Sequence, residues 1–453
     1  MKLLDRLGYA GLLLLVVLAP LPLGSNREWS WSLCMVVIGV LTLLWALSHL
    51  RGEPPPRIFM HWSIPGLFLL ACAWAFLQQA GWTPAAWHHP LWSMTAGLPG
   101  ADLPGRVSLS PEDTMTALMR LLGYGLVFFL ALQFGRDRAR AQAMFGWLAL
   151  AGLAYAVFGL FVYWGGYHPD WLFGERLLAH DVRSTFINRN HFATWQGLAM
   201  LCAMAWFYHR MAKPEVKPYA VPQDRETRTV EFILKAWKPM TALLLMVTAL
   251  VLTHSRGGFV ATLCGTIVLM VLLDRRVSSR STLSRVTVGT ALAVASIAFY
   301  LTSELLLDRI NRTDITTEAR MEVFANVERA IGDNPVLGFG YGTFADSFRL
   351  YDQVEDTVQY DRAHNTWLEN AFELGVPAAL ALYLALGGLA VTCWRGVARR
   401  YRDWVFPATG AAASVLVGVH ATVDFSLQLP AVAILYATIM GVGVAQSYSS
   451  IDA

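Results

Sequence analysis

Charged side chains are scarce in this sequence. Only 15% of its 453 residues are Asp, Glu, Lys or Arg, whereas 55% are hydrophobic, and the mean hydropathy is +0.44. Soluble domains carry about 25% charged residues. The composition therefore excludes an ordinary soluble protein and predicts a polytopic membrane protein.

Cysteine is also rare, and the sequence has no cysteine or histidine spacing typical of a metal site. Each of the five cysteines falls within an apolar run, so none lies in an outer loop where an oxidising compartment would pair it. We expect them to be small core residues: Cys34, Cys72, Cys202, Cys264 and Cys393.

Long apolar runs, by contrast, recur along the chain. A helix needs about 20 residues to cross the hydrocarbon core of a bilayer. Hydropathy predicts an all-α polytopic fold with twelve transmembrane helices. The predicted spans are 8–24, 30–49, 59–80, 114–135, 143–164, 191–208, 239–254, 258–273, 287–306, 376–393, 405–423 and 430–447. The first span, preceded by Lys2 and Arg6, resembles a signal peptide, but the topology requires it as a retained helix.

Basic residues set the orientation of these spans. With the N-terminus in the cytoplasm, 22 of the 35 Lys and Arg residues lie on the cytoplasmic side, which is the positive-inside pattern. All five lysines are among them: Lys2, Lys213, Lys217, Lys235 and Lys238. We therefore predict that both termini are cytoplasmic.

The outer side has no lysine, and its twelve cationic residues are all arginine. Ten of them lie between residues 176 and 362. The planar guanidinium matches phosphate oxygens, which favours a diphosphate ligand. High-GC coding also favours arginine over lysine, but it does not explain the clustering. The twelve are Arg27, Arg106, Arg176, Arg183, Arg189, Arg256, Arg309, Arg312, Arg320, Arg329, Arg349 and Arg362.

Arg256 lies between two apolar runs that are each slightly too short for a full span. These runs, 239–253 and 259–273, hold its guanidinium at or just below the outer surface. A charge at that depth is expensive unless it faces protein or a water-filled cavity, so Arg256 indicates a functional site.

The longest outer segment has a pattern of its own. An amphipathic helix is expected from Thr316 to Asp333, then a tight glycine turn at 338–342 and a second helix at 364–374. Such helices should lie along the outer surface and cover the spans. The chain thus divides into helices one to nine in 1–302, a large periplasmic loop in 303–375, and helices ten to twelve in 376–453.

The second outer loop ends in a polar segment, Asn188-Arg189-Asn190-His191, at the start of the sixth span. Asparagine is a good helix cap, but two asparagines, an arginine and a histidine in four residues exceed what a cap needs. A cap and a ligand-binding site both remain open here.

Arg320 and His364-Asn365, in the large loop, complete a candidate site with Arg256 and 188–191. Alone, Arg320 also suits a solvated surface charge, and His364 a structural histidine. Together these elements supply arginines for a diphosphate and one imidazole that accepts a proton near neutral pH. No Asp-x-Asp pair lies near them, so arginines rather than a metal are expected to supply the compensating charge.

Three further ionisable residues lie within predicted spans or directly beside one. His420 and Asp424 are expected to share one helical face near the outer end of the eleventh span, where they orient an acceptor or pin two helices. Arg120, near the outer end of the fourth span, either snorkels or adds to the diphosphate site.

The spacing of His364-Asn365, nine residues and Gly375 resembles the His-Asn/Ser/Gln, nine residues, Gly-x-x-small signature of the O-antigen ligases. These enzymes belong to the ligase and polymerase superfamily of bacterial surface polysaccharide synthesis. Ala378 stands at the last signature position, where glycine is more usual. Ser255-Arg256-Gly257 resembles the Ser-Arg element of the family.

Two more segments carry the resemblance. Arg320, with the run ending in Pro335-x-x-Gly338-x-Gly340, resembles the arginine-bearing helix of the family's periplasmic loop. Residues 186–193 look more like polymerase-type and ligase-related members of exopolysaccharide clusters than like the best-known lipopolysaccharide ligases. The acceptor therefore stays open between the lipid A core, a growing polysaccharide and a protein hydroxyl.

The resemblance implies an inverting, metal-independent glycosyltransferase of the bacterial inner membrane, with a fold resembling the GT-C class and a periplasmic active site. The donor would be a glycan on undecaprenyl diphosphate, with no cofactor and no nucleic-acid partner. Arg256 and Arg320 would neutralise the diphosphate, and His364 would be the general base on an acceptor hydroxyl. The implied substrate-binding residues are Arg189, Asn188, Asn190, His191, Asn365 and Arg120.

Two other functions remain open. Flippases and transporters of lipid-linked substrates often have twelve spans, but this sequence lacks their half-to-half symmetry and midplane charges. A non-catalytic assembly subunit would leave the arginine–histidine cluster without a purpose.

Overall fold

The computed structural model describes residues 2–50, 61–94, 104–165, 181–211, 225–274, 321–352 and 360–448. These residues form helices and turns, with no strand among them, which confirms the all-α prediction. The long helices are α1 (Lys2–Leu18), α2 (Glu28–His49), α3 (Ser63–Gln78), α5 (Pro111–Phe134), α6 (Arg138–Gly165), α8 (Arg189–Met211), α9 (Arg225–Val251), α10 (Arg256–Asp274), α14 (Val376–Arg399), α15 (Val405–His420) and α16 (Pro430–Ala445).

Each predicted span within the described ranges is occupied by one of these helices, and the predicted span 287–306 lies outside the described residues. Five described helices are long and apolar enough to cross a membrane: α2, α5, α6, α10 and α14. Four shorter apolar segments are α3, α15, α16 and the Ala236–Val251 part of α9. The chain is therefore a polytopic helical membrane protein, whereas the count of twelve spans stays a prediction.

One face of α2 shows why the bundle suits a bilayer. Leu33, Val36, Val40, Leu43 and Leu47 recur at alternating spacings of three and four residues, and each is exposed. An exposed apolar stripe with helical periodicity would be a liability in water, whereas hydrocarbon solvates it.

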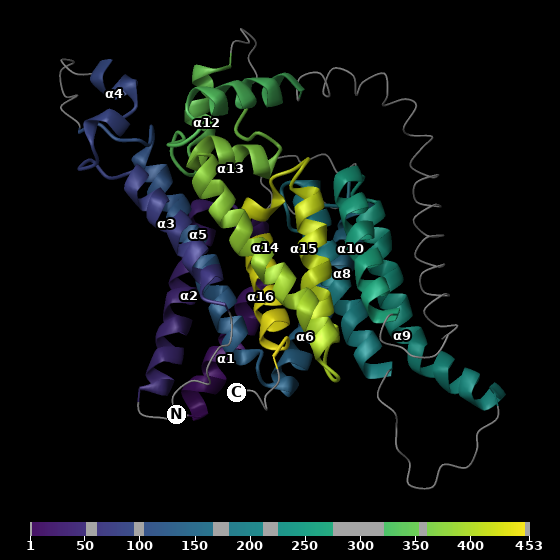
Figure 1. The fold of residues 1–453 in the computed structure, drawn as a ribbon. Helices are drawn as coiled ribbons and strands as arrows, with labels where there is room; N and C mark the ends of the chain where they lie inside the picture. Colours follow the sequence, from purple (N-terminus) through teal and green to yellow (C-terminus); the bar gives the residue numbers. More distant parts are fainter. Residues whose placement is uncertain are drawn as a thin grey trace.

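Helix α16 forms the centre of the bundle. Every residue of α16 is buried, which is typical of a helix that is apolar all round. It packs closely against α5, because a Cβ atom added to Gly441 would lie 2.6 Å from the Phe128 carbonyl oxygen. Figure 1 shows α16 behind α14 and beside α15 and α6.

One end of the bundle, which we call the basal end, contains the start of α1 and the end of α16 (Figure 1). Arg140 at the start of α6 forms an ion pair with Asp5. Arg138 and Asp403, just before α15, form another, with 2.7 Å between Nε and Oδ1. Both termini thus lie at one end, while their cytoplasmic location remains a prediction.

The opposite end is covered by a cap, which we define as residues 321–352 and 360–375. It contains a helical segment at 321–333, the short helices α12 (Phe344–Ser347) and η3 (Phe348–Leu350), and α13 (Thr366–Leu374). Its small apolar core includes Phe339 stacked on Phe372, with 4.5 Å between the ring centres. The smaller helices of the rest of the chain are η1 (Leu23–Ser25), η2 (Ala85–Trp87), α4 (Pro90–Met94) and η4 (Ser426–Gln428).

The glycine turn predicted at 338–342 is present in the cap. Gly338, Gly340 and Gly342 all have positive φ, at 67°, 112° and 83°. The Gln78 side chain of α3 donates to the carbonyls of Leu337 and Glu373, at 2.7 and 2.8 Å. The turn therefore fastens the cap to the membrane helices.

Candidate functional site

The candidate site begins at the start of α8. Asn188 caps this helix, because its Oδ1 accepts a hydrogen bond from the Asn190 backbone N–H at 2.8 Å. The Asn190 side chain donates instead to Asp424 Oδ1, at 3.2 Å, in the loop after α15. The structure thus gives one asparagine the capping role and lets the other join two helices.

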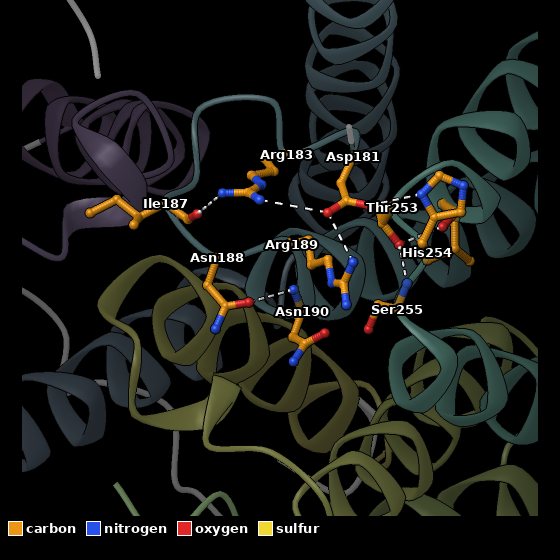
Figure 2. Close-up of polar contacts among 10 residues, drawn as sticks. Asp181, Arg183, Ile187, Asn188, Arg189, Asn190, Thr253, His254 and Ser255 are labelled. Carbon is orange, nitrogen blue, oxygen red and sulfur yellow. Dashed lines mark hydrogen bonds and ion pairs between the residues drawn. The ribbon is translucent and has the colours of Figure 1, made fainter. Parts of the chain in front are cut away.

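A buried carboxylate, Asp181, ties the loop before α8 to the turn between α9 and α10 (Figure 2). Its Oδ2 atom accepts from Arg189 Nη1 at 2.9 Å and lies 3.6 Å from Arg183 Nη2. Its Oδ1 atom lies 2.8 Å from His254 Nδ1. Burial alone would raise the pKa of Asp181, but His254 and Arg189 outweigh it and lower that pKa to about 2.

The turn that presents Arg256 is built from its neighbours. His254 has a φ of 52°, a region that non-glycine residues seldom adopt. Ser255 caps α10, with its Oγ accepting from the Gly258 N–H at 3.2 Å. Arg256 is then the first residue of α10, is exposed, and makes no hydrogen bond or ion pair within the described part of the chain.

The start of α10 packs against the end of α15. A Cβ atom added to Gly257 would lie 2.8 Å from Val423 Cγ2 and 3.1 Å from His420 Nε2. The other ring nitrogen of His420, Nδ1, lies 2.5 Å from Thr194 Oγ1 on α8. His420 therefore joins α8, α10 and α15.

The predicted helical pair His420 and Asp424 is corrected by the structure. Helix α15 ends at His420, and the chain turns there, with the Val423 N–H bonded to the His420 carbonyl at 3.0 Å. Asp424 thus lies in the following loop rather than on the same helical face. Its carboxylate binds Asn190 and Ser426, and its carbonyl accepts from Thr366 Oγ1 at 2.9 Å.

Phe425 brings the remaining elements together. Its ring meets His191 edge to face at 4.8 Å and His364 at 5.2 Å, measured between ring centres. The Arg362 guanidinium carbon lies 5.8 Å from the centre of the same ring. The loop before α13 and the start of α8, which are far apart in sequence, therefore meet around one aromatic side chain.

His364 and Asn365 have different local roles. His364 adopts a positive φ of 53°, which holds its ring toward Phe425. Asn365 caps α13, with Oδ1 accepting from the N–H groups of Trp367 and Leu368 at 3.0 and 3.2 Å. The signature dipeptide thus combines a constrained imidazole with the cap that fixes the helix behind it.

Among the described residues that were predicted for the site, Arg120 stands apart from this convergence. Arg120 lies on α5 with its guanidinium carbon 5.6 Å from the Trp31 ring centre, a cation–π contact to α2. Arg320 lies outside the described residues. Among the residues that the structure describes, no group of three metal-binding side chains is found.

Sequence reasoning missed Asp181, Glu369 and Phe425, and it named Arg362 only among the outer arginines. Asp181 was detectable, because it is an acidic residue among the arginines of its loop and opposite charges so placed are expected to pair. The position of Phe425 has no sequence signal, since its contacts come from three distant segments.

Residues 241–384 match the model of a family described as O-antigen ligase. The match begins in α9 and ends in α14, so it includes Arg256, the cap and His364. This match confirms the resemblance for residues 241–384, and this part of the chain is similar to the O-antigen ligases. A search of curated proteins found no match.

Proposed function

We propose that this protein, which carries an O-antigen ligase domain, transfers a glycan from undecaprenyl diphosphate to an acceptor hydroxyl at the periplasmic face. The main support is the arrangement at the cap end. There, Arg256 is exposed, is unpaired within the described part of the chain, and begins α10 beside His420. The His364 ring packs against Phe425, which lies in the connection between α15 and α16 that follows His420.

Arg256 is suited to bind the diphosphate. Its guanidinium presents a planar fork of donors, and the N-terminus of α10 adds a partial positive charge at the same place. In the proposed reaction, Arg256 and Arg320 stabilise the negative charge that develops as the bond between the anomeric carbon and the phosphate oxygen breaks. These arginines, rather than a metal ion, supply the compensating charge.

His364 is the proposed general base. Its imidazole takes the proton of the acceptor hydroxyl while that oxygen attacks the anomeric carbon from the face opposite the diphosphate. The new glycosidic bond has the inverted configuration, and the undecaprenyl diphosphate leaves with the electron pair of the broken bond.

The other predicted residues support these two. Arg189 is ion-paired with Asp181. We therefore propose that its main role is to hold the loop before α8 in place, and that it is not the main ligand of the diphosphate. Asn190 and His191 lie at the same helix start and contact Asp424 and Phe425. His420 and Asp424 pin α8, α10 and α15 around the site.

Incubating the purified protein with a lipid-linked oligosaccharide and candidate acceptors tests the proposal. Transfer requires a new glycosidic bond, so the acceptor must gain mass on a gel, as one discrete shift for a ligase or as a ladder for a polymerase. Addition of EDTA should leave the rate unchanged. Movement of the lipid-linked substrate across vesicles without any new bond would contradict transfer and indicate a flippase.

A further inference from the structure

A second buried carboxylate lies directly behind His364. Glu369, on α13, is fully buried, and its carboxylate accepts three hydrogen bonds. Oε1 accepts from Arg362 Nη1 and from Gln428 Nε2, both at 3.0 Å. Oε2 accepts from the backbone N–H of Ala363 at 2.9 Å.

These three donors come from two loops that meet at the site. Arg362 and Ala363 immediately precede His364, and Gln428 belongs to η4, three residues after Phe425. One carboxylate therefore connects the loop that carries the imidazole to the loop that carries the ring on which the imidazole packs.

The conformation of His364 needs such a restraint. Its φ of 53° lies in a region that residues with a Cβ atom seldom adopt, so the backbone at His364 is strained. Without an anchor on the preceding residues, the loop would lower its free energy by relaxing to an ordinary backbone conformation. The hydrogen bond that the Ala363 N–H donates to Glu369 fixes the backbone one residue before the strained position.

A buried ion pair is a poor device for stability alone. Desolvation of two charges offsets most of their attraction, so an apolar pair would hold the cap as well. Glu369 has a buried carboxyl neighbour, Glu373, whose pKa is raised by burial and by the charge of Glu369. Arg362 Nη1 is bonded directly to Glu369 Oε1, at 3.0 Å.

We propose that Glu369 is a positioning residue for the transfer reaction, holding His364 in its strained conformation on Phe425 through Arg362, Ala363 and Gln428. This inference rests on the proposed function, in which His364 is the general base. Glu369 itself does not touch substrate in this proposal. Its effect is on the chemical step, and donor binding does not depend on it.

The test measures kcat and KM for the lipid-linked donor in the glycan transfer assay. Glu369→Gln should lower kcat by about 100-fold, as expected for a displaced catalytic group, with KM changed less than about twofold. The double variant Arg362→Gln/Glu369→Gln should recover about tenfold of that loss, because two amides can bond without an unpaired charge. Gln428→Ala, which removes one of three bonds, should lower kcat by about tenfold.

Asp403→Asn is the matched control. It breaks an arginine–carboxylate ion pair at the basal end whose carboxylate is similarly buried, with 2.7 Å between Arg138 Nε and Asp403 Oδ1. Its kcat should stay within about twofold of the parent. A loss in Asp403→Asn as large as in Glu369→Gln would overturn the inference, since both effects would then reflect general stability.

His364→Ala separates this inference from the proposed function. If His364→Ala is inactive while Glu369→Gln has the parent kcat, the positioning role is wrong and the general base remains. If His364→Ala is fully active, the proposed reaction itself is wrong. Failure of the double variant to recover activity would also overturn the positioning role.

Discussion

At the scale of single residues, the arginines of the cap end divide into paired and unpaired groups. Arg183 and Arg189 share the carboxylate of Asp181, and Arg362 is bonded to Glu369. Arg256 has no carboxylate partner within the described part of the chain. A paired guanidinium holds structure, whereas an unpaired one at a helix start remains available to an anionic ligand.

Replacement of Arg256 tests this division. Arg256→Ala should lower kcat/KM for the lipid-linked substrate by at least about 100-fold, because the guanidinium that stabilises the charge of the leaving diphosphate is lost. Arg256→Lys should retain part of the activity, since the charge stays but the planar fork does not. Arg349, another outer arginine that is largely exposed, provides the control, and Arg349→Ala should be within about twofold of the parent.

Asp181 yields a prediction about pH. Its folded pKa of about 2 lies below the ordinary value of about 3.9, so its stabilising contribution is complete above about pH 4. That contribution is lost as the pH falls from about 4 towards 2. Asp181→Asn should therefore unfold at a lower temperature than the parent at pH 7. The difference between the two melting temperatures should become smaller towards pH 2.

The comparison uses thermal unfolding in detergent, followed by tryptophan fluorescence. Charge-assisted hydrogen bonds contribute about 1.5–3 kcal/mol, which sets the expected size of the effect at pH 7. If the difference between the two melting temperatures stays constant from pH 7 to pH 2, Asp181 stabilises the loop by packing rather than by charge.

At the scale of elements, Gly375 joins the cap to the membrane helices. It ends α13 and begins α14 with a φ of 75°, and an added Cβ atom would lie 2.2 Å from the Val336 carbonyl oxygen. The signature glycine thus has a physical reason, because only glycine allows the cap and α14 to approach so closely. His364 at the other end of α13 depends on that junction for its position.

Gly375→Ala should destabilise the protein and reduce glycan transfer. The strained φ alone costs about 1–3 kcal/mol, and the contact with the carbonyl adds to it. Gly387→Ala on α14 is the control, because a Cβ atom there meets nothing within 4 Å and alanine favours the helix by about 1 kcal/mol. Equal melting temperatures of the two variants would contradict the argument.

The sequence predicts helices well here because apolar length and periodicity are local properties. The turn at 338–342 is likewise local, since its glycines have to adopt positive φ. The position at which α15 ends is not a local property. The spacing of four residues therefore wrongly placed His420 and Asp424 on one helical face. Asp424 instead takes its partner from Asn190, a tertiary contact that no local pattern contains.

The same distinction applies to the candidate site. Arg256 and 188–191 were predicted as site residues because each combines unusual polarity with a position at the end of an apolar run, and His364 was predicted from its spacing to Gly375. Glu369 was not, because a glutamate on an amphipathic helix looks like a solvated residue until Arg362 and Gln428 are seen around it.

At the scale of the whole molecule, the cap end and the basal end should lie on opposite sides of the membrane. Asp361 is exposed in the cap and Arg402 is exposed at the basal end. Four native cysteines are buried and Cys264 is partly buried, so background labelling should be low. In intact cells with a permeable outer membrane, an impermeant maleimide should label Asp361→Cys but not Arg402→Cys.

Breaking the inner membrane should then make Arg402→Cys reactive, while the parent chain stays unlabelled. Labelling of Arg402→Cys in intact cells would contradict the predicted cytoplasmic location of the termini. Equal labelling of Asp361→Cys and Arg402→Cys both before and after disruption would also contradict that predicted location.

The burial of α16 has a consequence for biosynthesis. Gln446, just after α16, bonds to the carbonyl of Gly135, a residue 311 positions earlier. At about 5–20 residues per second, a ribosome needs roughly 15–60 seconds to make the chain between them. Throughout that interval the inserted N-terminal helices have no central packing partner, so the nascent protein depends on lipid or on insertion factors. A transcript truncated before Pro430 should give a product that quality-control proteases remove.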